Sequence, residues 1–169
     1  QQFIAQVETA IALIEQQNPG LVLIFGAVVE RNKYLYNSAI IVQPGKPVQS
    51  YAKHYLPNYG VFDEQRYFQP GNQACVIDVE GLGLGITVCE DIWYPEPCAL
   101  SVQSGAQIIV NLNASPFHAS KHDQRIQQVK QRVFENKVPV LYVNMVGGQD
   151  ELVFDGYSFA VNAEQEVVL

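Results

Sequence analysis

The sequence predicts an α/β sandwich with mixed β-sheets. Apolar runs short enough to be strands alternate with longer segments whose apolar residues recur at helical spacing, and the chain closes with short strand-like runs. One early apolar run shows no polar alternation, which is typical of a strand buried on both faces. The chain has 169 residues, of which 48% are hydrophobic, so we expect one domain with a sizeable core.

The first part of the chain predicts one helix and three strands. A helix is expected to end near Gln17, before the turn Asn18-Pro19-Gly20, because apolar residues precede it at helical spacing: Phe3, Val7, Ala10, Ile11 and Ile14. Apolar runs then indicate strands over residues 21–29, 34–42 and from 48 to 52, with polar turns at 30–33 and 43–46.

Residues 53–72 show no clear period and are predicted to form a loop. The stretch mixes aromatic rings with charged side chains. A loop of about 20 residues inside a compact domain is uncommon and often functional. The alternative is a surface loop that its aromatic rings hold in place.

The second part of the chain alternates strands with helices. Strands are expected at 75–79, 84–88, 107–112 and 138–143, helices at 96–104 and 123–136, and loops at 113–121 and 147–152. The second helix has Ile126, Val129 and Val133 as its inner stripe. Residues 156–161 and 166–169 are expected to pair as an antiparallel hairpin.

Charge and composition limit the classes of partner. A net charge of −7 argues against binding to nucleic acid or to an anionic membrane. No apolar run approaches the roughly 20 residues of a membrane span, and the first segment lacks the pattern of a signal peptide. Three cysteines, Cys75, Cys89 and Cys98, show no disulfide spacing, which favours a reduced, cytoplasmic protein.

Cys89 lies at the centre of the chain's most distinctive stretch. The β-branched run Ile86-Thr87-Val88 precedes it, two carboxylates and Trp93 follow, and Pro95 and Pro97 suit the start of a helix. A thiol at such a strand-to-helix junction can be exposed at the edge of a sheet and react as a thiolate. The alternative is a small apolar side chain that fills space at a strand end.

Two other groups of residues could contribute chemistry. Lys53 follows a strand and opens the long loop, where its charge could stabilise an oxyanion, although an ordinary surface lysine is the alternative. The histidines are His54, His118 and His122, and none stands in the context of a cysteine protease. The spacing of His118 and His122 permits a metal pair, but no third ligand is evident, and we expect no metal site.

Four stretches stand out, and in chain order they are YAKHYLPNYGVFDE from Tyr51, followed by RYF; VCEDIW from Val88; NASPF from Asn113, followed by Lys121; and NMVGGQDELVFDG from Asn144. Together they resemble the nitrilase superfamily, in the version of the glutaminase (carbon-nitrogen hydrolase) domain of glutamine-dependent NAD synthetases. The similarity extends from about Leu21 to the end of the chain. It implies a nitrilase-like α-β-β-α sandwich with two mixed sheets.

The resemblance also implies roles for single residues. Cys89 is the nucleophile that attacks the side-chain amide of glutamine, Lys53 stabilises the tetrahedral intermediate, and Glu64 holds the lysine ammonium. Further residues match positions that line the glutamine pocket: Tyr59, Ser115 and Lys121. The products are ammonia, which passes to an adenylated deamido-NAD intermediate in a synthetase domain, and glutamate. An amidase with another substrate and a silent assembly domain are the alternatives.

The family's general-base glutamate, which precedes the lysine, finds no counterpart among Glu8, Glu15 and Glu30. We therefore expect residues 1–169 to be a partial domain, incomplete at both ends, inactive alone and without the synthetase domain. Cofactors are expected only in that missing domain: ATP, Mg²⁺ and deamido-NAD. A homo-oligomer is also expected by the resemblance.

Overall fold

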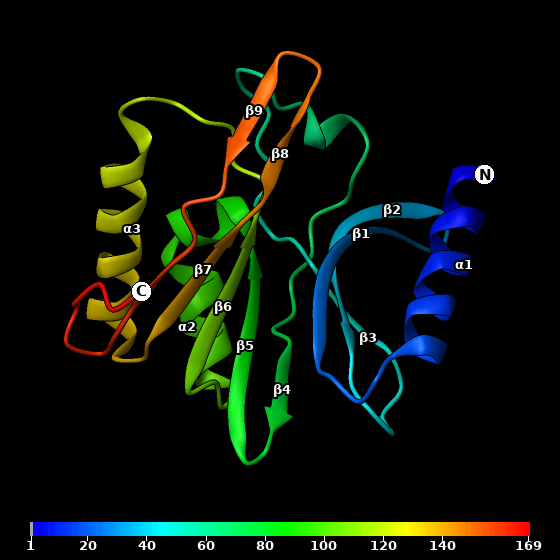
Figure 1. The fold of residues 1–169 in the computed structure, drawn as a ribbon, viewed down its shortest axis with the longest axis horizontal. Helices are drawn as coiled ribbons and strands as arrows, with labels where there is room; N and C mark the ends of the chain where they lie inside the picture. The colour runs from blue at the N-terminus through cyan, green and yellow to red at the C-terminus, as the bar shows by residue number, and fades with distance from the viewer. Residues whose placement is uncertain (1) are drawn as a thin grey trace. The chain divides into compact units, whose positions relative to one another are not determined.

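The computed structural model describes residues 2–169 and divides the chain into two compact units that meet in sequence after Gln73. Each unit combines one main β-sheet with helices (Figure 1). Both units thus have the α/β character that the sequence predicts.

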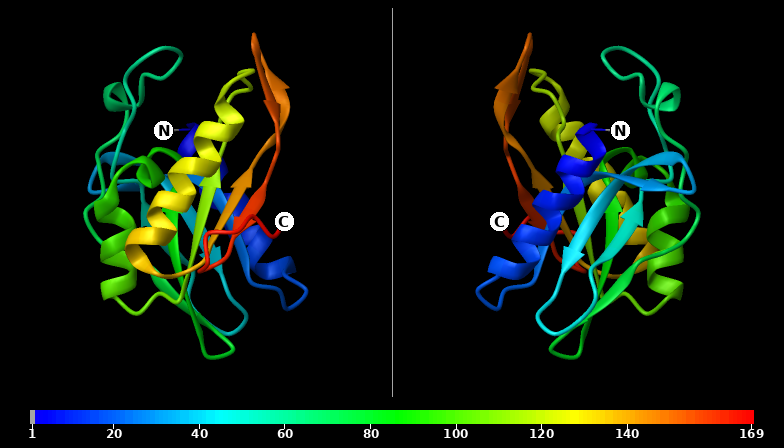
Figure 2. Two further views of the ribbon diagram at one scale, coloured as in Figure 1. Left: turned by 90° about the vertical axis from the view of Figure 1, so that its left-hand side faces the viewer. Right: turned by 90° about the vertical axis from the view of Figure 1, so that its right-hand side faces the viewer.

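The first unit places helix α1 (Gln2–Gln17) beside an antiparallel sheet of order β1-β2-β3. The strands are β1 (Leu23–Arg31), β2 (Tyr34–Val42) and β3 (Gln49–Ala52). The right-hand view of Figure 2 shows α1 in front of these strands. Because β1 and β3 each pair with β2 in antiparallel orientation, only the sheet of the second unit is mixed among the described residues.

The β1–β2 hairpin is longer than the sequence predicts. Residue Glu30, expected in a turn, pairs with Leu35 inside the ladder. The turn is reduced to Asn32 and Lys33, whose φ angles of 52° and 68° are those of a tight two-residue connection. The loop after β3 is confirmed: among residues 53–72, regular structure is limited to the short 3₁₀ turn η1 (Glu64–Arg66), besides an isolated bridge to Leu35.

The second unit contains a mixed sheet of order β10-β7-β6-β5-β4. Its strands are β4 (Val76–Val79), β5 (Leu82–Val88), β6 (Ile108–Asn113), β7 (Val140–Asn144) and β10 (Phe159–Val161). The central strands β5, β6 and β7 are parallel, so their carboxyl ends lie at the same edge. That edge is the usual place for ligands in open α/β sheets.

Helices α2 (Pro95–Gln103) and α3 (Lys121–Asn136) pack on each other and against this sheet, as the left-hand view of Figure 2 shows for α3. Val129 and Val133, predicted to face inward, are both 0% exposed. Burial of each contributes about 1.5–3 kcal/mol relative to an exposed side chain. The core cluster of this unit also contains Ile92, Cys98, Ile109, Val140, Tyr142, Phe159 and Val161.

One prediction for the end of the chain is wrong, and another is confirmed only in part. Residues 147–152 are not a loop, because β8 (Val146–Gln149) and β9 (Leu152–Asp155) form an antiparallel hairpin around Asp150, whose φ is 51°. The expected hairpin of 156–161 with 166–169 is confirmed in part: besides the bridge between Val161 and Val167, backbone hydrogen bonds join Ala160 to Val168 and Leu169, and Asn162 to Glu166. Positive φ angles of 71° at Gly156 and 52° at Tyr157 are not those of an extended strand. The strand β10 therefore begins only at Phe159, and it pairs with β7.

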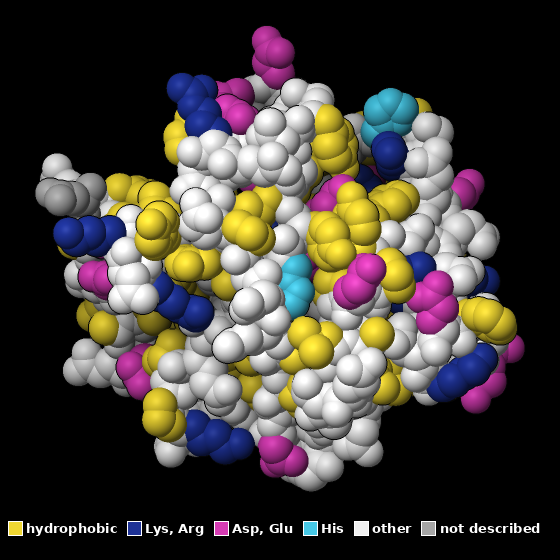
Figure 3. All heavy atoms as spheres, turned by 180° about the vertical axis from the view of Figure 1, so that it is seen from behind, with side chains coloured by type: hydrophobic (Ala, Val, Ile, Leu, Met, Phe, Trp, Pro, Cys, Tyr) yellow, Lys and Arg dark blue, Asp and Glu magenta, His cyan; other side chains and the backbone are white. Residues whose placement is uncertain are grey.

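Charged side chains are dispersed on the face shown in Figure 3, where basic groups lie among acidic ones instead of gathering in one patch. Within residues 2–169, no helix has both the length and the apolar character needed to cross a membrane.

Candidate functional site

The first unit holds the predicted lysine and glutamate in direct contact. Lys53 follows β3, is 1% exposed, and its Nζ lies 2.7 Å from Oε1 of Glu64. Glu64 accepts a second hydrogen bond at Oε2 from Asn37 Nδ2 at 3.1 Å. A buried ammonium is costly without a carboxylate partner, so this pair explains how Lys53 can be inside the protein. The predicted pair is therefore present.

Backbone contacts hold Lys53 from both sides. Its N–H donates to the carbonyl of Asn37 at 2.9 Å, and its carbonyl accepts from the N–H of Gly71 at 2.8 Å. A Cβ at Gly71 would lie 2.2 Å from the Ala52 carbonyl oxygen, so only glycine permits this approach. The two ends of the long loop are thereby tied together around the lysine.

Tyr59 lies in the same loop and is 59% exposed. Its ring meets Phe62 edge-on, with the ring centroids 6.0 Å apart. This contact orders the loop tip, and the exposed face of Tyr59 is compatible with a role in substrate binding, which stays a prediction.

In the second unit, Cys89 begins the 3₁₀ turn η2 (Cys89–Trp93) directly after β5. Its φ of 46° falls in the left-handed region, which is uncommon for a residue with a Cβ. The buried carboxylate of Asp91 accepts a hydrogen bond from the N–H of Val88 at 3.0 Å and closes the turn. The thiol thus lies at a sharp strand-to-turn junction, and α2 begins only at Pro95.

Ser115 reaches the thiol from the loop that follows β6. Its Oγ lies 3.9 Å from Cys89 Sγ and 3.1 Å from the hydroxyl of Tyr142 on β7. Three parallel strands therefore contribute the thiol, the serine loop and the phenol at the same sheet edge. Cys89 and Ser115 are thus brought together, and their roles as nucleophile and pocket residue stay predictions, whereas the sequence analysis did not identify Tyr142.

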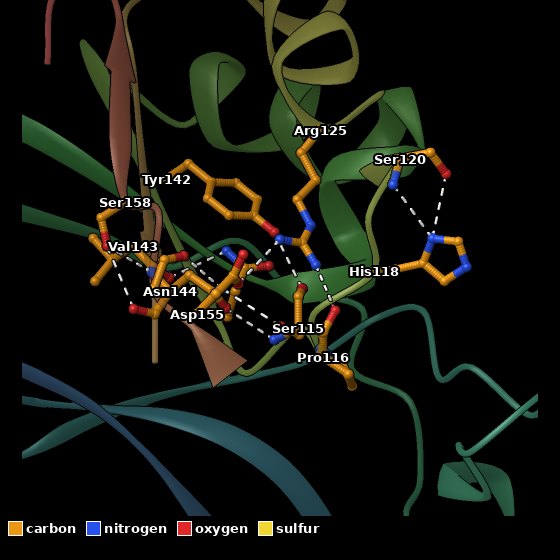
Figure 4. A network of polar contacts seen from close by, with 12 residues as sticks. Ser115, Pro116, His118, Ser120, Arg125, Tyr142, Val143, Asn144, Asp155 and Ser158 are labelled. Carbon is orange, nitrogen blue, oxygen red and sulfur yellow. Dashed lines mark hydrogen bonds and ion pairs between the residues drawn. The ribbon is translucent and has the colours of Figure 1, made fainter. Parts of the chain in front are cut away.

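Two further side chains that the sequence analysis missed fix the serine loop (Figure 4). Asn144 accepts at Oδ1 from the Ser115 N–H at 2.9 Å and donates through Nδ2 to the Gly156 carbonyl at 2.7 Å. Arg125 on α3 donates to the Pro116 carbonyl at 2.8 Å and lies 3.7 Å from Asp155. The signal that could have revealed Asn144 is a polar side chain at the carboxyl end of a buried parallel strand.

The phenol of Tyr142 is buried beside this network. Burial raises the pKa of Tyr142 to about 12, the hydrogen bond with Ser115 opposes that rise, and the nearby Cys89 adds to it. Tyr142 therefore keeps its proton throughout the physiological range.

Lys121 is the first residue of α3, and its Nζ lies 5.5 Å from the centre of the Trp93 ring at the end of η2. A cation at a helix N-terminus opposes the helix dipole, so its position does not favour helix stability. The structure brings Lys121 to the turn that carries Cys89, and its role toward substrate stays a prediction.

The other titratable candidates are not gathered into one cluster. His118 lies in the exposed loop beside Ser120, and His122 packs its ring 4.4 Å from that of Tyr157. Among residues 2–169 no group of three or more His, Cys, Asp or Glu has the arrangement of a metal site. Burial raises the pKa of both other thiols, that of Cys98 to about 12.

Comparisons with known proteins agree on one family. The profile described as carbon-nitrogen hydrolase matches residues 6–169. Glutamine-dependent NAD(+) synthetase of Xanthomonas campestris pv. campestris is 40% identical over 167 residues, which cover 98% of this chain and 30% of that protein. The Thermotoga maritima enzyme of the same name is 44% identical over 154 residues, covering 90% and 27%.

Solved structures give the same result for the fold. Glutamine-dependent NAD+ synthetase from Acinetobacter baumannii, in complex with ADP, has a TM-score of 0.90 at 37% identity and covers 98% of this chain and 31% of its own. A carbon-nitrogen hydrolase from Helicobacter pylori has a TM-score of 0.87 at 26% identity, covering 98% and 64%. The expected nitrilase-like fold is confirmed, and the chain spans about 30% of the length of the first curated relatives that it matches.

Proposed function

Because this chain belongs to the carbon-nitrogen hydrolase family, we propose that it hydrolyses the side-chain amide of glutamine as part of a glutamine-dependent NAD+ synthetase. Relatives with that name are 40% and 44% identical, whereas the Helicobacter pylori carbon-nitrogen hydrolase is 26% identical. The observation that carries the proposal is the position of the Cys89 thiol. Cys89 directly follows a strand, has a left-handed φ angle, and its Sγ lies 3.9 Å from Ser115 Oγ.

The reaction proceeds through a thioester. The thiolate of Cys89 attacks the amide carbon of glutamine, and the carbonyl electrons move to oxygen as a tetrahedral intermediate forms. Protonation of the amide nitrogen lets the C–N bond break, ammonia leaves, and the acyl group remains on sulfur. Water then attacks the thioester, glutamate leaves, and the thiol is regenerated.

Lys53 and Glu64 are proposed to stabilise the negative charge that develops on the carbonyl oxygen. A fixed ammonium offsets an oxyanion best where little water competes, and the 1% exposure of Lys53 supports that role. Glu64 holds the ammonium in one place. Tyr59, Ser115 and Lys121 are proposed to contact glutamine, with Lys121 facing its α-carboxylate.

The general base is proposed to lie outside residues 1–169. The carboxylates before Lys53 support this: Glu8 and Glu15 are exposed on α1, and Glu30 is exposed near the end of β1. Ammonia release from glutamine by the isolated segment should consequently be negligible beside that of the complete protein. Comparable turnover would show that the base is already present.

Use of the ammonia is assigned to a synthetase domain beyond this segment. The name of the curated relatives, glutamine-dependent NAD(+) synthetase, supports this part of the proposal. ATP, Mg²⁺ and deamido-NAD are proposed to bind in that domain. We further propose a homo-oligomer in the cytoplasm; the absence of disulfides among the three cysteines within residues 2–169 supports a reducing compartment.

The test is Cys89→Ala in the complete protein, with Cys75→Ser as the matched control. Glutamine-dependent NAD+ formation should fall to background, whereas synthesis from added ammonia should continue in both variants. Equal loss of both activities would assign Cys89 a structural role. Release of ammonia from other amides, but not from glutamine, would favour a different amidase.

A further inference from the structure

We propose that Tyr142 is a positioning residue that fixes the hydroxyl proton of Ser115 toward the sulfur of Cys89. The inference rests on the proposed function only in treating Cys89 as the nucleophile. It states which group donates and which accepts in the contacts among the three side chains, since the distances alone do not fix these directions.

The phenol of Tyr142 has little freedom to move. Tyr142 is 2% exposed, and its ring stacks on that of Phe159 with centroids 4.8 Å apart and planes 17° from parallel. Because β7 alternates buried and exposed side chains, Tyr142 and Asn144 occupy the same buried face. Both side chains reach Ser115, one at its hydroxyl and the other at its backbone.

The direction of the hydrogen bonds follows by elimination. A buried phenol proton needs an acceptor, and within residues 2–169 the Oγ of Ser115 is the hydrogen-bond partner of the Tyr142 hydroxyl. Since Tyr142 stays protonated, it donates to Ser115. The serine hydroxyl then has its own proton to donate, and its other side-chain neighbour is Cys89 Sγ at 3.9 Å.

Hydrogen bonds to the backbone also fix the position of Ser115. Asn144 binds its N–H at 2.9 Å, and Arg125 binds the next carbonyl, that of Pro116, at 2.8 Å. The backbone of Ser115 is therefore fixed, and its hydroxyl oxygen already accepts a hydrogen bond from Tyr142. The hydroxyl proton of Ser115 is left to point toward the sulfur of Cys89. A donor aimed at sulfur stabilises the thiolate over the thiol.

The experiment measures alkylation of Cys89 by iodoacetamide in the complete protein, quantified at that residue by mass spectrometry across pH. The variants are Tyr142→Phe, Ser115→Ala and the double variant. Tyr157→Phe is the control, because its ring is 60% exposed in the same unit and is not part of this network.

Tyr142→Phe should slow Cys89 alkylation at neutral pH by about 3- to 10-fold, the effect of losing one ordinary hydrogen bond, and move the rate profile to higher pH. Ser115→Ala should do the same, and the double variant should show no further change. Tyr157→Phe should match the parent protein. An unchanged profile in Tyr142→Phe, or additive effects in the double variant, would overturn the proposal.

A second substitution separates hydrogen bonding from packing. Replacement of Tyr142 by 3-fluorotyrosine keeps the ring and hydroxyl but makes the phenol a stronger donor. It should move the alkylation profile to lower pH, opposite to Tyr142→Phe. A shift in the same direction as Tyr142→Phe would indicate altered packing and sink the proposal.

The alkylation assay needs no glutamine, so the two proposals can fail separately. A normal response of Cys89 alkylation together with absent glutamine hydrolysis would refute the proposed function alone. Normal hydrolysis by the parent protein, with alkylation indifferent to Tyr142, would refute the positioning role alone.

Discussion

The lysine contact in the first unit and the cysteine contact in the second unit are built in different ways. Lys53 and Glu64 are 11 residues apart, lie in one loop segment, and form a direct ion pair at 2.7 Å. Cys89 is 26 residues from Ser115, which is 27 from Tyr142, and the three come from η2, the loop after β6 and strand β7. The first contact depends on one loop, whereas the second depends on the register of a whole sheet.

The difference affects which changes each contact should tolerate. A buried ion pair depends on charge, because removal of either partner leaves the other uncompensated. The cysteine contact consists of polar groups at one edge of the sheet, so it should depend on single hydrogen bonds and on the packing beneath them. The following predictions test this distinction.

Lys53→Met should have the largest effect. The side chain keeps its length and loses its charge, so the developing oxyanion loses its proposed cation. We expect glutamine hydrolysis in the complete protein to fall by about 100-fold or more, as for other lost oxyanion donors. Steady-state ammonia release would measure it, and a loss confined to KM would argue that Lys53 only binds substrate.

Glu64→Gln should have an intermediate effect, because Lys53 would remain buried without its carboxylate. A cost of about 3 kcal/mol in unfolding free energy is expected from comparable buried pairs. Asp63→Asn is the matched control, since the Asp63–Arg66 pair of the same loop is 52% and 70% exposed and should contribute less than about 1 kcal/mol. Urea unfolding of both variants would compare them, and equal costs would contradict the charge dependence.

Cys98 should give a smaller effect, confined to alkaline pH. Its folded pKa of about 12 lies above the ordinary value of 9.0, so its stabilising contribution is complete below about pH 9 and disappears as pH rises towards 12. Cys98→Ala should therefore flatten the decline in stability over that window, although it costs about 1 kcal/mol at neutral pH through lost packing. Urea unfolding at pH 8 and at pH 10.5 would test this, and parallel declines would exclude Cys98 as a cause.

Much of the fold could be predicted because strand and helix signals are local. The apolar runs located β2, β4 and β6, and the stripe of Val129 and Val133 located α3. The β8–β9 hairpin was missed because glycines at 147 and 148 weaken the strand signal, while Val146 and Val153 are 79% and 60% exposed. Its pairing depends on the turn at Asp150, which carries no apolar pattern.

The candidate residues of the two units were predictable to different extents. Lys53, Glu64 and Cys89 stand in distinctive local stretches, so their sequence context identified them. Tyr142 was missed since a tyrosine in an apolar run is typical of a core strand, and Asn144 was noted only as the start of a matching stretch, without a role. Their importance depends on the parallel pairing of β6 with β7, which brings Ser115 to them and which no local pattern encodes.

The left-handed backbone of Cys89 has a consequence for substitution at this position. An L-residue at such a φ of 46° costs about 1 kcal/mol that glycine avoids, and the same unit has both glycine (Gly81, φ 87°) and non-glycine residues (Asp150, φ 51°) in this region. Folding alone therefore favours glycine at position 89. Cys89→Gly should therefore leave the sheet intact while it removes the thiol, so the backbone gives no reason for a cysteine at this position.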